Sequence, residues 1–74
     1  MIKLPIIKAK KLIKILKKLG FVPIRQEGSH IFFKHPDGRT TVVPYHSSQD
    51  IGRGLLRVII EDIKITPQQF ERLI

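Results

Sequence analysis

The stretch that decides the fold is residues 30–43, HIFFKHPDGRTTVV. Two runs rich in aromatic and β-branched residues, 30–35 and 40–43, flank a Pro-Asp-Gly step. Asp-Gly between such runs is a strong hairpin signal, because glycine takes a positive φ without steric cost. The stretch therefore predicts two adjacent antiparallel strands.

The residues before this hairpin predict a third strand and a helix. Residues 21–26 form the strand and 27–29 the turn, and Pro23 indicates a sheet edge or strand start because proline has no N–H to donate. Residues 8–19, KAKKLIKILKKL, predict an amphipathic helix that ends at Gly20 and begins without a polar capping residue. Its apolar side consists of Ala9, Leu12, Ile13, Ile15, Leu16 and Leu19.

After Pro44 the pattern changes to a polar loop over residues 45–54, followed by two helices. The first, residues 55–62, has the apolar set Leu55, Leu56, Ile59, Ile60 and Ile63. The second is short: Thr66 is the N-cap, Pro67 suits the first helical position and Gln69 can close a capping box. Phe70, Leu73 and Ile74 supply its apolar face.

This order of elements predicts an α+β two-layer sandwich, with a three-stranded antiparallel sheet and the helices on one of its faces. A chain of 74 residues is expected to form a single domain over residues 1–74. The absence of cysteine excludes disulfides and thiolate metal sites. No apolar run is long enough to span a bilayer, so we expect a cytoplasmic protein with no membrane partner.

The net charge of +8 is the dominant global feature. This positive charge favours a polyanionic partner: nucleic acid, an acidic protein or an anionic membrane surface. Membrane lysis by the lysine-rich helix is disfavoured because the rest of the chain has its own core pattern. The candidate cations on the helix are Lys10, Lys11, Lys14, Lys17 and Lys18, although a lysine face is often only a solvated surface.

The histidines do not form a metal site. His30 and His35 lie an odd number of residues apart on one strand, so they point to opposite faces of the sheet. No cysteine is available as a further ligand, and we therefore expect neither a metal nor a cofactor. His35 has a simpler interpretation as a turn-flanking residue, and His46 as a loop residue.

Histidine is the side chain that can transfer protons near neutral pH, and RNA hydrolysis needs little more. The 2′-hydroxyl attacks its own phosphate when a base removes its proton and cations stabilise the developing charge. His30 begins a strand and shares its face with Phe32 and Lys34, a stacking surface and a phosphate contact. The alternatives are a half-exposed polar residue at His30 and a cross-strand packing partner at Phe32.

Six short motifs carry a resemblance to a known family. They are LGF at 19–21, GSH at 28–30, HPDGR at 35–39, VPYH at 43–46, GLLRVII at 54–60 and TPQQF at 66–70. In this order and spacing they resemble the HicA family, also called YcfA-like, of toxins from toxin–antitoxin pairs. The resemblance implies a double-stranded-RNA-binding-domain-like fold, mRNA interferase activity and a HicB antitoxin that binds the toxin and masks its essential histidine.

Residue by residue, the resemblance makes His30 the essential histidine, with Gly28 and Ser29 at the preceding motif positions and His46 as a supporting residue. The chain departs from the family pattern at Leu55 and Lys64, where threonine and glycine are usual. We predict a metal-independent endoribonuclease; the alternative is a non-catalytic RNA-binding module of the same fold. The predicted RNA-binding residues are Lys10, Lys11, Lys14, Lys17, Lys18, Phe32, Lys34 and Arg39.

Overall fold

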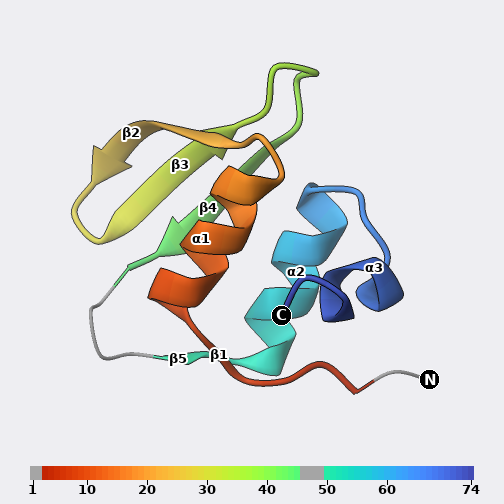
Figure 1. The fold of residues 1–74 in the computed structure, drawn as a ribbon. Helices are drawn as coiled ribbons and strands as arrows, with labels where there is room; N and C mark the ends of the chain where they lie inside the picture. Colours follow the sequence, from red (N-terminus) through yellow and green to blue (C-terminus); the bar gives the residue numbers. More distant parts are fainter. Residues whose placement is uncertain (1–2, 46–49) are drawn as a thin grey trace.

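A computed structural model describes residues 3–45 and 50–74 (Figure 1). The elements are β1 (Ile7–Lys8), α1 (Ala9–Lys18), β2 (Val22–Glu27), β3 (His30–Lys34), β4 (Thr40–Pro44), β5 (Asp50–Ile51), α2 (Arg53–Asp62) and α3 (Pro67–Glu71). The sheet has the order β2-β3-β4 and is antiparallel throughout. The predicted α+β class and the double-stranded-RNA-binding-domain-like order α-β-β-β-α are confirmed.

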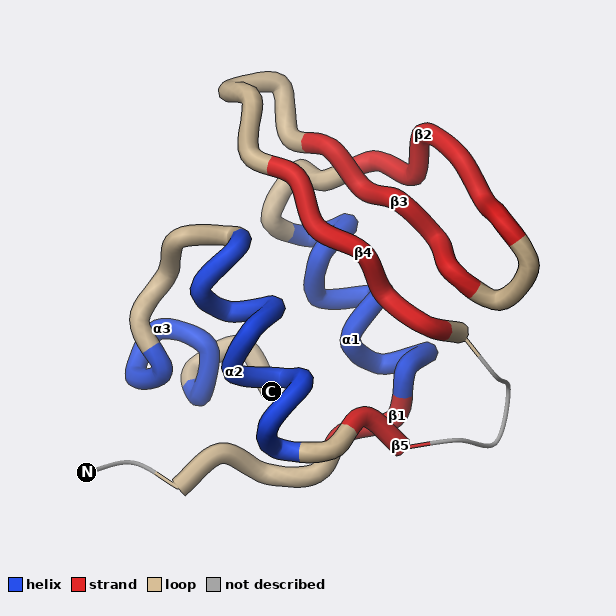
Figure 2. Tube along the Cα trace, turned by 180° about the vertical axis from the view of Figure 1, so that it is seen from behind, coloured by secondary structure: helices blue, strands red, loops and turns tan. Residues whose placement is uncertain are grey.

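The helices lie against one end of the sheet and leave the other end uncovered. Figures 1 and 2 show α1 and α2 on the same side of the sheet near β4, with α3 against α2. The β2–β3 hairpin projects away from them, and its turn at residues 28–29 lies far from α2 in both views. The molecule is accordingly flat, measuring 34 × 30 × 17 Å.

Strand β2 is one edge of the sheet, in agreement with Pro23, which indicated a sheet edge or a strand start. All six of its residues are exposed. A register shift between Pro23 and Arg25 adds a bulge to its pairing with β3. Proline, a bulge and charged side chains are the features that keep an edge strand from pairing with other chains.

The core lies between the inner face of the sheet and the apolar sides of α1 and α2. Phe33 and Val43 from the sheet are buried together with Leu12, Leu16 and Leu56 from the helices. The predicted apolar side of α1 is confirmed: Ala9, Leu12, Ile15 and Leu16 are buried, and Ile13 and Leu19 pack against the core.

Two residues assigned to apolar helix faces are exposed instead. Leu55 is 39% exposed because α2 buries the stripe formed by residues 56, 59, 60 and 63, and position 55 lies at its margin. Ile74 is 45% exposed and follows α3, which ends at Glu71, so helical periodicity does not govern its direction.

Both long helices end in a Schellman motif. At the end of α1, Gly20 has φ 102°, its N–H donates to Lys17 O, and the N–H of Phe21 donates to Leu16 O. At the end of α2 the equivalent left-handed residue is Lys64, with φ 58°. The glycine of the family pattern is therefore replaced at a position that still has the left-handed backbone. The capping box at Thr66 and Gln69 is confirmed.

The sequence did not predict β1 and β5, which pair with each other. Ile7 lies opposite Ile51 and Lys8 opposite Asp50, with an ion pair of 2.9 Å between the Lys8 and Asp50 side chains. This ladder fixes the chain just before α1, where no side chain caps the helix.

The predicted loop over residues 45–54 needs correction at its end. Residues 50–51 form β5, and α2 begins at Arg53, so Gly54 is helical rather than part of the loop. The guanidinium of Arg53 donates to Leu4 O at 2.6 Å, which ties the start of α2 to the segment before β1.

Candidate catalytic and RNA-binding site

His30 is the exposed first residue of β3. In the two-residue turn before His30, Gly28 has φ 59°, a left-handed conformation that favours glycine. The carbonyl of the second turn residue, Ser29, accepts a hydrogen bond of 2.6 Å from Tyr45 N. In the sheet His30 lies opposite Glu27 on one side and Pro44 on the other. The backbone of His30 is therefore held on both sides while its ring is open to solvent.

The alternation along β3 is as predicted. Phe33 is buried and Ile31 packs against the core, whereas His30 and Lys34 are exposed on the outer face of the sheet. Phe32 lies on the same outer face, and the guanidinium of Arg25 lies over its ring at 4.2 Å from the ring centroid. This cation–π contact gives Phe32 a cross-strand partner inside the protein.

Glu27 is a further candidate residue, which the sequence pattern did not single out. It lies directly opposite His30, and side chains in such positions have Cβ atoms about 4.5–5.5 Å apart on the same face. Its carboxylate also binds Arg25 Nε at 3.0 Å. The signal was present in the motif Glu-Gly-Ser-His, because a two-residue turn pairs the residues on either side of it.

The lysines of α1 divide into two sets. Lys10, Lys14 and Lys17 line a groove of about 470 Å³ together with Ile13, Ile31 and Tyr45. Lys11 and Lys18 do not line this groove. Because Ile31 faces the core side of the sheet, the groove lies on the opposite side from His30.

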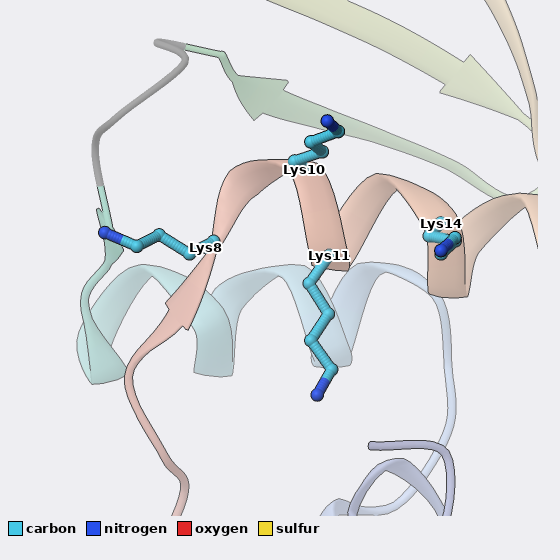
Figure 3. A pocket seen from close by; sticks show the side chains of 4 residues that line it. All are labelled: Lys8, Lys10, Lys11 and Lys14. Atoms are coloured by element: carbon cyan, nitrogen blue, oxygen red, sulfur yellow. The ribbon is translucent and has the colours of Figure 1, made fainter.

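A second hollow, of about 480 Å³, is lined by Lys8, Lys10, Lys11 and Lys14 (Figure 3). Figure 3 shows Lys10 and Lys11 pointing to opposite sides of α1, and Lys8 pointing toward β5. These ammonium groups diverge, so the hollow does not hold them around one anion.

Arg39 has partners within the protein. Its Nε donates to Asp37 Oδ2 at 2.8 Å, its Nη1 donates to Ile63 O at 2.5 Å, and its guanidinium lies 5.2 Å from the Phe21 ring centroid. The hydrogen bond from Arg39 holds the pKa of Asp37 below its usual value. Arg39 thus joins the β3–β4 turn to the end of α2 and is not brought together with His30.

His35 also has a structural role, beyond flanking the turn. The backbone N–H of Asp37 lies 3.1 Å from its Nδ1, and its Nε2 lies 3.1 Å from Leu19 O. The same Nδ1 also lies 3.0 Å from Asp37 Oδ1. The ring also packs edge-on against Phe21. His35 and Asp37 therefore resemble a histidine–aspartate pair, but both ring nitrogens of His35 are engaged in contacts that hold the turn to the end of α1.

Three further observations concern His46, metal binding and membrane insertion. His46 lies outside the described residues. Residues 3–45 and 50–74 contain no group of three or more His, Cys, Asp or Glu arranged to hold a metal ion. In the same part of the chain, no helix has the length and apolar character needed to cross a bilayer.

The fold, the basic helix and the exposed strand histidine define a small α+β protein suited to polyanions. A family model described as the HicA toxin of bacterial toxin-antitoxin matches residues 9–65. The chain therefore belongs to the HicA toxin family of bacterial toxin–antitoxin systems. As the toxin of such a system it has an antitoxin partner. A comparison with curated proteins found no match.

Proposed function

We propose that this protein is a metal-independent endoribonuclease, an mRNA interferase that acts in the cytoplasm and uses His30 as its catalytic residue. The observation that carries the proposal is the position of His30: it is exposed, held by ladder pairing on both sides, and opposite a carboxylate. Family membership supports the same residue, since His30 completes the Gly-Ser-His motif.

In the proposed reaction His30 acts as general base. Its neutral imidazole accepts the proton of the RNA 2′-hydroxyl, whose oxygen attacks the adjacent phosphorus while the bond to the 5′-oxygen breaks. The products are a 2′,3′-cyclic phosphate and a free 5′-hydroxyl, which takes its proton from the imidazolium or from water. Lys34, on the same face of β3, supplies positive charge for the phosphate.

Glu27 acts as a positioning residue for His30. A carboxylate opposite an imidazole orients the ring and stabilises the imidazolium that forms. Replacing Glu27 by Gln should lower the cleavage rate at saturating RNA and leave RNA affinity unchanged or tighter, because the change removes a negative charge. If Glu27→Gln increases both RNA binding and cleavage, the Glu27 carboxylate affects RNA only through the net charge of the protein and does not position His30.

The proposed antitoxin is of the HicB type and masks His30. An acidic partner would be attracted by the net charge of +8, which speeds association and selects against basic partners. The turn between β2 and β3 lies at the uncovered end of the sheet (Figure 1), and His30 is the first residue of β3 after this turn, so a partner can reach both without moving a helix.

Growth arrest tests the function in cells. Induction of the wild type should stop growth, co-expression of the antitoxin should restore it, and His30→Ala should be harmless at equal protein level. Thr40→Ala is the matched control, because Thr40 is another exposed strand residue of the same sheet. Full toxicity of His30→Ala would show that the catalytic assignment is wrong.

A further inference from the structure

We infer that the groove between α1 and the core side of the sheet binds a single strand of RNA, which then passes around the end of β3 to reach His30. The groove is lined by Lys10, Ile13, Lys14, Lys17, Ile31 and Tyr45. The inference rests on the proposed function, because it takes RNA to be the substrate.

The chemistry of the groove is that of a strand-binding surface. Lys10, Lys14 and Lys17 follow one another at i, i+4 and i+7, so they form a row along one side of α1. Among the described residues, the ion pairs of the protein involve other side chains, and these three ammonium groups have no carboxylate partner. The groove therefore presents unneutralised positive charge along its edge.

The rest of the groove is apolar and aromatic. Ile13, Ile31 and Tyr45 are partly buried and pack against the core, so they form a fixed surface. Proteins bind single strands by combining a basic row for phosphates with aromatic or apolar surfaces for bases. The row from Lys10 to Lys17 rises about 10 Å along the helix, enough for two or three nucleotides at about 3.4 Å or more per step.

The position of the groove relative to His30 favours a single strand over a duplex. Ile31 faces the core side of the sheet, whereas His30 faces the outer side, so the sheet separates the groove from the proposed catalytic residue. The hydrogen bond from Tyr45 N to Ser29 O places the Tyr45 end of the groove beside the turn that carries His30. A flexible single strand can bend around this strand end. An A-form duplex is recognised as a stiff shape across its minor groove and cannot follow both faces.

The test compares two double variants with the same change in charge. Lys10→Gln with Lys17→Gln removes two charges from the groove, and Lys11→Gln with Lys18→Gln removes two from the remainder of α1. Each pair is seven residues apart on the same helix and exposed, so both variants should fold normally. All measurements use a His30→Ala background, which keeps the RNA intact.

The measurement is fluorescence anisotropy with a labelled 12-nucleotide single-stranded RNA and a 16-base-pair duplex, across a salt series. We expect the groove variant to bind the single strand at least tenfold more weakly, with the salt slope reduced by about 1.4, or 0.7 for each lost phosphate contact. The Lys11/Lys18 variant should lose less than threefold. Tyr45→Leu, which keeps an apolar side chain, should weaken single-strand binding about tenfold without changing the salt slope.

Two results would overturn the inference. Equal losses in the two lysine variants would mean that only the overall charge matters. Loss of antitoxin binding in the groove variant, with RNA binding intact, would make the groove a protein-docking surface. The proposed function fails separately from this inference. A wild type that binds RNA through the groove but never cleaves it would support the groove and refute the nuclease activity. Cleavage without groove-dependent binding would support the nuclease activity and refute the groove.

Discussion

Replacing Lys64 by glycine should stabilise the protein, because Lys64 has a left-handed backbone with φ 58°. An L-residue in this region costs about 1–2 kcal/mol, and glycine loses about 0.5–1 kcal/mol more backbone entropy on folding. The expected net gain is about 0.5–1 kcal/mol, or roughly 2–8 °C in Tm for a domain of this size. The Schellman hydrogen bonds of residues 64 and 65 should be unchanged.

Lys64→Ala is the matched control. It removes the same charge from the end of α2 but keeps a side chain at the left-handed position, so it should be no more stable than the wild type. Urea denaturation and thermal melting followed by circular dichroism measure all three proteins. If Lys64→Gly is no more stable than Lys64→Ala, the assignment of backbone strain to Lys64 is wrong.

Three further changes test the packing around the turns. Gly20→Ala should destabilise the fold by about 1–3 kcal/mol in urea denaturation, because Gly20 has φ 102° and a Cβ there would lie 2.9 Å from His35 Nε2. Asp37→Asn should lower Tm at neutral pH by weakening the contact with Arg39. Because the pKa of Asp37 is lowered from 3.8 in the folded state, its stabilisation is present above that value and is lost as the pH falls through the folded pKa. The Tm difference should therefore close in acid, and a difference independent of pH would contradict this. Leu55→Thr should change stability by less than about 0.5 kcal/mol, since Leu55 is exposed; a large loss would show that it packs.

The parts of the fold that the sequence predicted have strong local signals. Asp37-Gly38 is flanked by strand-forming runs and produced the β3–β4 hairpin. Gly20 ended α1, and Thr66 with Gln69 capped α3 through hydrogen bonds within a single turn. Each signal depends on residues within a few positions of one another, which is why the pattern alone was sufficient.

The parts that escaped prediction depend on contacts between distant residues. β1 and β5 are two residues each, too short for periodicity, and they exist through pairing across more than forty positions. Arg39 looked like a free cation, but its partner Ile63 O comes from the end of α2. His35 similarly reaches back to Leu19 O. No local pattern identifies such partners.

In the candidate site, too, the features set by local sequence were predictable and those set by tertiary packing were not. Alternation placed His30, Phe32 and Lys34 on the outer face, and the structure agrees. The division of the α1 lysines was not predicted, because it depends on how the helix is rotated against Ile31 and Tyr45. That rotation is set by tertiary packing, which a helical pattern alone leaves undetermined.

The most direct test of the central claim is RNA cleavage by purified protein in the presence of a chelator. Wild type and His30→Ala, prepared identically, are incubated with a long RNA and the products are resolved by gel. The account predicts cleavage by the wild type, products ending in a 2′,3′-cyclic phosphate, and a loss of about 10²–10⁴-fold in rate for His30→Ala. Equal cleavage by the two proteins, or tight RNA binding with no cleavage by either, would contradict it.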